Sequence, residues 1–225
     1  MSVVSDTIDW LSDSTHWSGD DGVPNRLVEH LGYTVETIAI ASVIAIPIGL
    51  WIGHTGRFRS FAVGLTGAMR ALPTLGLLTA VALYLGIGLT APLVALVILA
   101  VPPLLAGAYA GLESVDRQTI DAARAMGMTE WQILSKVEVP LALPIIVGGI
   151  RSAVLQVVAT ATVAAYVGLG GLGRYLIDGQ AVSDYAQMAA GSVLVIALAL
   201  ALDAVFAALQ GIALGRRPTT HPSHA

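Results

Sequence analysis

The sequence predicts an all-α integral membrane protein with five transmembrane helices. Hydrophobic residues make up 56% of its 225 residues and charged residues only 12%, whereas soluble domains carry about 25% charged residues. The mean hydropathy is +0.78. Five stretches are mostly apolar over the roughly 20 residues that a helix needs to cross the hydrocarbon layer of a bilayer. Lipid is therefore the expected surrounding of most of the chain.

Residues 1–30 precede the first span and are polar and acidic. They contain no positively charged region that leads into an apolar stretch, so we do not expect a signal peptide. Trp10 and Trp17 fit a short helix at the lipid headgroups, and a partly disordered tail is the alternative. The expected spans then cover residues 33–53, a stretch within 60–88 that is uncharged from Ala71 to Leu89, 91–112, 143–167 and 188–214.

Basic residues follow the first, third and fifth spans, which places them on one side of the membrane. Cytoplasmic loops are enriched in Lys and Arg, so this side is expected to be the cytoplasm. The amino terminus is then outside, residues 31–214 form the transmembrane domain of a plasma (inner) membrane protein, and residues 215–225 form a cytoplasmic tail. The basic residues are Arg57, Arg59, Arg117, Arg124, Lys136, Arg216 and Arg217.

The loop of residues 113–143, which we call the interspan loop, is too polar to cross the membrane. Ser114 or Asp116 can cap a short helix that runs towards Met126. Gly127 can adopt the left-handed conformation that commonly ends such a helix. We therefore expect the first half of the loop to be helical.

A second helix is expected to start at Thr129, because Gln132 three residues later completes a capping box. Pro140 and Pro144 are expected to bound this helix and lead into the fourth span. Ala122, Ala123 and Ala125 beside Gly127 would form a smooth ridge that the groove of another protein can receive. The alternative is an interfacial hairpin that only connects two spans.

The segment DAARAMGMTEWQILSKVEVPLALP resembles the "EAA" loop of binding-protein-dependent ABC importer permeases. The family pattern, Glu-Ala-Ala, three residues, Gly and a later Leu-Pro, differs here at Asp121 and Val139. The resemblance implies the five-span type I importer permease fold, with a cytoplasmic coupling helix that docks into an ATPase subunit. The residues expected to couple to the ATPase are Asp121, Ala122, Ala123, Arg124, Gly127, Met128, Thr129, Trp131 and Pro140.

Other stretches, such as MRALPTLGLLTAV and AYVGLGGLGRYLIDG, resemble permeases for glycine betaine, carnitine, choline or proline betaine. A methionine-type permease shares two of the loops and is the alternative. The resemblance implies alternating access and four kinds of partner: a second permease chain (identical or not), two ATP-binding cassette subunits that hold ATP and Mg, an extracytoplasmic substrate-binding protein and membrane lipid.

Several other functions find no support in the sequence. It contains no P-loop pattern, so ATP hydrolysis is expected on a partner chain and neither enzymatic activity nor a cofactor is expected here. The absence of cysteine excludes thiolate chemistry, and we expect no metal site and no nucleic-acid partner. Residues 168–173 match G-x-G-x-x-G but lie between two spans, where a turn is the better interpretation. A channel, an ion-coupled carrier or a membrane scaffold are the alternatives from other classes.

Charged residues within spans are functional candidates, because a charge in the membrane is costly. Asp203 and Arg70 are expected to lie within helices and are candidates to pair with each other. Arg151 is expected to extend to the cytoplasmic interface. The residues expected to line the translocation path are Tyr166, Thr160, Thr162 and Asp203.

Overall fold

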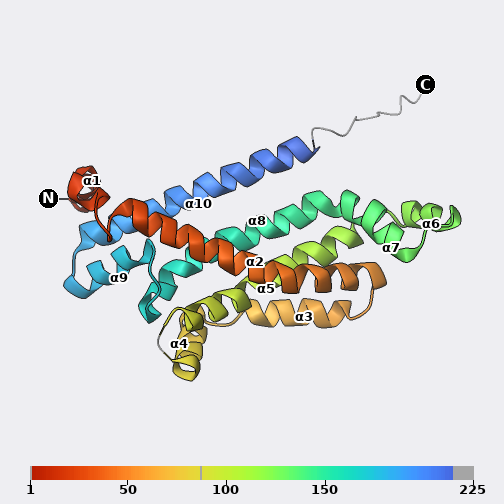
Figure 1. Ribbon diagram of the computed structural model, residues 1–225, viewed down its shortest axis with the longest axis horizontal. Coiled ribbons are helices and arrows are strands. Elements are labelled where there is room, and N and C mark those ends of the chain that lie inside the picture. The colour runs from red at the N-terminus through yellow and green to blue at the C-terminus, as the bar shows by residue number, and fades with distance from the viewer. Residues whose placement is uncertain (1, 87, 215–225) are drawn as a thin grey trace.

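The computed structural model describes residues 2–86 and 88–214, and helices are the regular structure throughout these residues. The expected tail of residues 215–225, with Arg216 and Arg217, lies outside them. Figure 1 shows an elongated bundle with α1 and α9 at one end and α6 and α7 at the other. The elements are α1 (Val3–Ser12), the 3₁₀ turn η1 (Ser14–Trp17), α2 (Val23–Thr55), α3 (Arg59–Arg70), α4 (Thr74–Leu85), α5 (Thr90–Glu113), α6 (Arg117–Ala125), α7 (Glu130–Ile133), the π-helical turn η2 (Leu134–Glu138), α8 (Val139–Ala164), the 3₁₀ turn η3 (Ala165–Val167), α9 (Gly173–Val182) and α10 (Tyr185–Leu214).

Four helical runs in the described residues are long and apolar enough to cross a membrane: α2, α5, α10 and the continuous run Glu130–Val167. The bent pair α3–α4 makes a fifth crossing if it counts as one span. The predicted all-α membrane fold is thereby confirmed. The first span begins at Val23 rather than at residue 33, and its 33 residues reach over about 50 Å.

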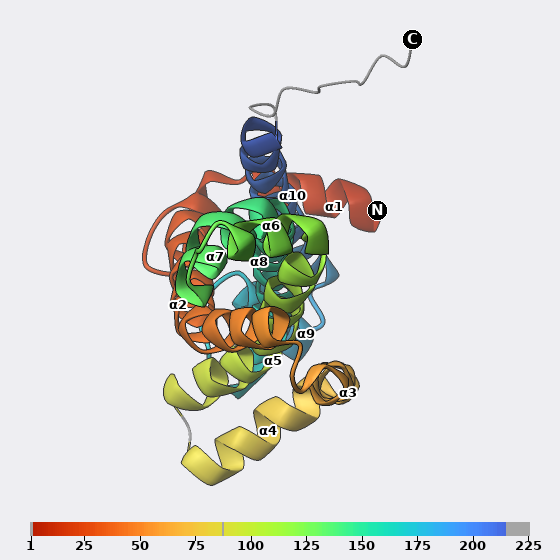
Figure 2. The same cartoon turned by 90° about the vertical axis from the view of Figure 1, so that its right-hand side faces the viewer.

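The second span, expected within residues 60–88, is bent. Helices α3 and α4 meet at an angle of 89°, and Figure 2 shows both of them beside the rest of the bundle. Proline lacks an amide hydrogen and disfavours the helical conformation of the residue before it, so Pro73 ends the helical run at this point. Arg70 lies in the last turn of α3, directly before the bend.

Small residues bring the central helices α2, α5 and α8 into close contact. Ala41, Ala45 and Gly49 recur every fourth residue on the buried face of α2. At the crossing of α5 and α8, a Cβ atom on Gly107 would lie 2.6 Å from the Cα atom of Gly149. Membrane helices associate largely through such close packing of small residues, because lipid gives them no hydrophobic driving force.

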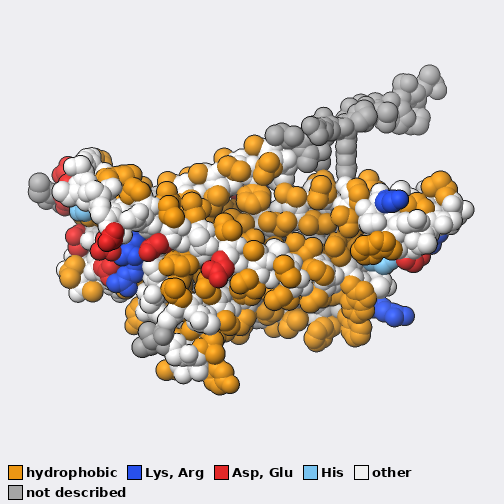
Figure 3. Space-filling model, in the orientation of Figure 1, with side chains coloured by type: hydrophobic (Ala, Val, Ile, Leu, Met, Phe, Trp, Pro, Cys, Tyr) orange, Lys and Arg blue, Asp and Glu red, His pale blue; other side chains and the backbone are white. Residues whose placement is uncertain are grey.

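The end of the bundle that carries α1 and α9 is helical where a tail or a loop was considered. Helix α1 lies against α10, and Trp10 is 9% exposed in a cluster with Tyr175, so the alternative of a partly disordered tail is wrong for residues 2–22. The segment expected as a loop between the fourth and fifth spans contains helix α9. Figure 3 shows apolar side chains over the middle of one face, with charged groups gathered mostly at the two ends.

Candidate functional site

The first half of the interspan loop folds as its caps predict. The Asp116 carboxylate accepts a hydrogen bond from the amide of Gln118 at 2.9 Å and starts α6. Gly127 adopts φ +83°, its amide donates to the carbonyl of Arg124 at 2.9 Å, and the next amide, of Met128, donates to the carbonyl of Ala123 at 3.2 Å. This pair of bonds is the Schellman motif, which satisfies the last carbonyls of a helix.

The second half of the loop begins as predicted and ends differently. Thr129 and Gln132 form both bonds of the capping box. The expectation that prolines bound this helix is wrong, because α7 continues through the π-helical turn η2 into α8. Pro140 is the second residue of α8, directly after the π-helical turn η2, and such local adjustments let a packed membrane helix accept a proline. Pro144 is inside α8, as packed membrane helices allow.

The two helices of the loop have an inner and an outer face. Ile120, Ala123 and Ile133 are buried in a cluster with residues of α5 and α8. Met128 also packs against this cluster, so Ala123 and Met128 support the loop from inside. The other expected coupling residues before α8 are exposed: Asp121, Ala122, Arg124, Gly127, Thr129 and Trp131. Pro140 is exposed at the start of α8.

Met126 was not among the expected coupling residues, yet its side chain is 76% exposed, as much as the 74% of Trp131. The exposure of Met126 could have been predicted from its position directly before the glycine turn. A helix ends there, so no further turn of the helix covers the side chain. The outer face of the loop therefore presents small alanines flanked by two large apolar side chains.

Ion pairs hold the two loop helices together. The guanidinium of Arg124 donates to both carboxylate oxygens of Glu130, at 2.9 and 3.0 Å, and lies 3.5 Å from Asp121. The hydrogen bond with Glu130 is the main reason why the pKa of Arg124 is raised. A two-pronged pair of this kind fixes geometry better than a single contact between exposed charges.

A histidine of α2 joins this network from the bundle side, and the sequence patterns did not point to it. His54 lies in the last turn of α2. Its Nδ1 contacts the carboxylate of Glu138, and its Nε2 lies 3.3 Å from that of Glu130. Because 84 residues separate His54 from Glu138, only the packing of α2 against the loop could reveal the contact.

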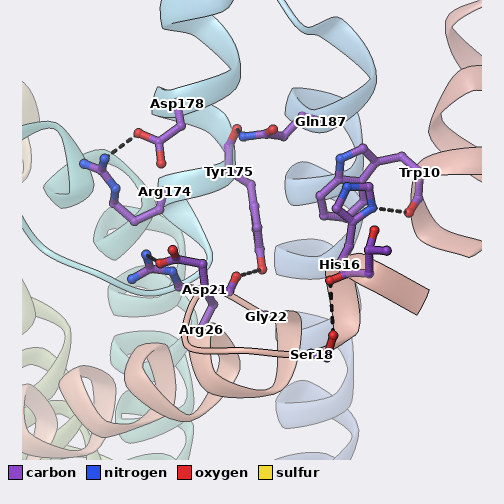
Figure 4. Close-up of a pocket in the computed structure, with 11 residues that line it drawn as sticks. Trp10, His16, Ser18, Asp21, Gly22, Arg26, Arg174, Tyr175, Asp178 and Gln187 are labelled. Carbon is purple, nitrogen blue, oxygen red and sulfur yellow. Dashed lines mark hydrogen bonds and ion pairs between the residues drawn. The ribbon is translucent and has the colours of Figure 1, made fainter. Parts of the chain in front are cut away.

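At the end of the bundle that carries α1, a cavity of about 400 Å³ lies between η1, the start of α2, α9 and α10. Figure 4 shows the ion pairs Arg26–Asp21 and Arg174–Asp178 around it. The hydroxyl of Tyr175 donates to the carbonyl of Asp21 at 2.7 Å, and burial raises the pKa of this tyrosine. Each ion pair is local to its own segment, and the hydrogen bond of Tyr175 ties α9 to the segment before α2.

The expected path residues fall into separate places. Thr162 and Tyr166 line a groove of about 350 Å³ between α4, α8 and α9. In the described part of the chain, Thr160 lies outside that groove and its hydroxyl donates to the carbonyl of Gln156 at 2.8 Å. Asp203 lies on α10 and binds Arg151 of α8.

The pair of Arg151 and Asp203 corrects the expectation for Arg151 and gives Asp203 a partner other than the candidate Arg70. Both of its nitrogen–oxygen distances are 2.7 Å. Arg151 also donates to the side-chain oxygen of Gln210 at 3.1 Å instead of extending to the interface. It lies about 18 Å along the helix from the start of α8.

We expect the variant Asp203→Leu to unfold at a markedly lower temperature, because it leaves the Arg151 cation within the membrane without its carboxylate. The double variant Arg151→Met, Asp203→Leu should recover about half of this loss or more, since replacing both charges by apolar groups is often nearly neutral. Thermal unfolding followed by size-exclusion chromatography measures both. Asp178→Ala breaks a half-buried pair within α9, a helix that is not among the membrane spans, and is the control. Equal stability of Asp203→Leu and Asp178→Ala would contradict the prediction.

Comparison with known protein families gives the decisive observation. Residues 45–216 match the family described as "Binding-protein-dependent transport system inner membrane component". The chain belongs to this family. The matched range includes the last third of α2 and everything from there to the end of α10, the interspan loop among it. The permease domain therefore accounts for most of the chain.

Characterised relatives of this permease align along nearly their whole length. The carnitine transport permease protein OpuCB of Listeria monocytogenes is 30% identical over 81% of this chain and 84% of its own. The glycine betaine/carnitine/choline transport system permease protein OpuCB of Bacillus subtilis is 31% identical over the same shares. The osmoprotectant import permease protein OsmW of Salmonella typhimurium is 30% identical over 91% of this chain and 95% of its own.

Solved structures confirm the fold of the permease. An inward-facing structure of the MetNI methionine ABC transporter superposes with a TM-score of 0.74 at 24% identity, over 85% of this chain and 95% of that one. An amino acid ABC transporter with histidines gives a TM-score of 0.66 at 19% identity, over 94% of this chain and 98% of that one. The predicted fold of a type I ABC importer permease is confirmed.

Proposed function

We propose that this permease forms the membrane pathway of an ATP-driven importer for a quaternary-ammonium osmolyte such as glycine betaine, carnitine or choline. The observation that carries the proposal is its 30–31% identity with carnitine, glycine betaine/carnitine/choline and osmoprotectant permeases over 81–91% of the chain. A methionine substrate is the second candidate. It has less support, because the methionine transporter is 24% identical to this chain and supports the fold alone.

The interspan loop is the proposed docking site for the ATPase subunit. Its outer face presents Ala122 and Ala125 between the large side chains of Met126 and Trp131. Small residues on an exposed helix let the backbone of a partner approach closely, and large apolar side chains at the edge can anchor the contact. In this proposal the loop faces the cytoplasm, the amino terminus lies outside, and two ATPase subunits bind ATP and Mg.

The mechanism proposed is alternating access in a pair of permease chains, identical or not. The docking helix α7, the turn η2 and α8 form one continuous helical run, Glu130–Val167. Movement of the loop by the ATPase is therefore passed along the backbone to Thr162 and Tyr166 at the other end of the run. An extracytoplasmic binding protein would deliver the solute there. The groove that Thr162 and Tyr166 line has a volume of about 350 Å³ on one chain, and we expect the partner chain to complete the path.

Uptake into vesicles tests the proposal. The permease is reconstituted with its ATPase subunit and binding protein, and labelled glycine betaine is compared with labelled methionine. We expect ATP-dependent uptake of glycine betaine that unlabelled carnitine or choline reduces and that ceases when ATP is omitted. Uptake of methionine alone would favour the second candidate, and failure of the permease to bind any ATPase subunit would refute the importer function.

A further inference from the structure

We propose that His54 is the residue that positions the interspan loop against the bundle, because its ring contacts two carboxylates of the loop. The side chain of His54 is 15% exposed and lies between two carboxylates of the loop. Its Nδ1 contacts Glu138, which is 3% exposed within the turn η2, and its Nε2 lies 3.3 Å from Glu130 of α7. One ring thus touches both halves of the second loop helix.

The two contacts of the ring differ in kind. The Nδ1 atom forms a hydrogen bond with the carboxylate of Glu138, whereas Nε2 lies near the carboxylate of Glu130 at 3.3 Å. Glu138 is 3% exposed, and a buried carboxylate that loses its hydrogen-bond partner is costly. His54 is therefore the partner from α2 that this buried carboxylate needs.

The charged groups around His54 form a continuous chain towards the outer face of the loop. Glu130 is bound on its other side by Arg124 of α6, and Arg124 in turn lies 3.5 Å from Asp121. The other charged groups at this end point away or are paired: Arg57 and Lys136 are exposed, and Arg59 binds Glu113 of α5 at 2.9 Å. His54 is therefore the link between α2 and the ion pairs that hold the proposed docking surface.

Loss of the imidazole would therefore release the second loop helix from α2. This behaviour rests on the proposed function only where it concerns transport.

Tryptic cleavage after Arg124 measures the release of the loop without any partner protein. The purified full-length permease in lipid nanodiscs is digested between about pH 6 and about pH 8.5, and variants are compared at equal pH. We expect His54→Lys, which stays cationic, to be cleaved slowly at each pH. His54→Gln and Glu138→Gln should be cleaved about tenfold faster than wild type, because each loses a charge-assisted contact.

His16→Gln is the matched control, since His16 lies in η1 at the other end of the molecule, and it should be cleaved at the wild-type rate. The proposal is overturned if His54→Gln is cleaved like the wild type at every pH, or if His54→Lys is cleaved as fast as His54→Gln. In the reconstituted importer, the solute transported per ATP should fall in His54→Gln and recover in His54→Lys. Failure of the wild-type permease to bind an ATPase refutes the proposed function, and the cleavage rates still decide the role of His54.

Discussion

Replacing Gly127 by valine is expected to lower ATP-dependent uptake about tenfold, which corresponds to the coupling free energies of 1–3 kcal/mol that are typical between two sites. Gly127 has φ +83° and closes the Schellman motif between α6 and α7. A β-branched residue is strained in this conformation by about 1–2 kcal/mol. The turn would open, and α6 would no longer hold Ala122 and Ala125 in place.

Space is not the reason for this effect, because a Cβ atom on Gly127 would meet no other atom within 4 Å. Gly127→Asn is therefore the matched control, since asparagine tolerates the left-handed conformation, and it should keep most of the uptake. The measurements are uptake in vesicles, co-purification of the ATPase subunit and the amount of permease in the membrane. Full uptake by the valine variant would mean that the shape of this turn has no part in coupling.

Replacing Gly149 by alanine is expected to destabilise the permease by about 2 kcal/mol, as overpacking of a close contact usually does. The new Cβ atom would lie 2.7 Å from the Cα atom of Gly107 and 3.1 Å from the carbonyl oxygen of Pro103. Backbone atoms cannot rotate away as a side chain can, so α5 and α8 would have to separate. For a chain of this size we expect the midpoint of thermal unfolding to fall by about 4–8 °C.

The adjacent glycine provides the control for this variant. A Cβ atom on Gly148 would meet only the side-chain nitrogen of Gln210, at 3.4 Å, and that amide can move. Gly148→Ala should be neutral or slightly stabilising, because alanine favours the helix by up to about 1 kcal/mol over glycine. Equal unfolding temperatures of the two alanine variants would show that the crossing of α5 and α8 adapts without cost.

Local features of this permease could be predicted from the sequence, because each depends on residues close together in the chain. The cap at Asp116, the turn at Gly127 and the capping box of Thr129 are set by bonds within a few residues. The apolar spans were predictable for a similar reason, since crossing a bilayer needs a run of about 20 residues. The sequence also carried the resemblance to the family, through the interspan loop.

Contacts between distant residues could not be predicted in this way. Asp203 is 52 residues from Arg151. Hydropathy indicates that burying either charge in a membrane costs free energy, but it does not indicate which charged groups form a pair. His54 is 84 residues from Glu138, and a single histidine near a helix end is common. The bend at Pro73 could not be predicted for another reason. Summed hydropathy measures how apolar a stretch is, and it does not give the direction of the helix axis on either side of a proline.

The contact of Gly107 with Gly149 has a mechanical consequence for the run Glu130–Val167. Gly149 is close to the midpoint of these 38 residues. Its contact with Gly107 of α5 can therefore serve as the pivot about which the run tilts, with two nearly equal arms. Each arm is about 28 Å long at 1.5 Å per residue. If the helix tilts about this point, the end that carries Trp131 and the end that carries Tyr166 move by similar distances in opposite directions. An inward pull on one side of the membrane is then an outward swing on the other, at a ratio close to unity.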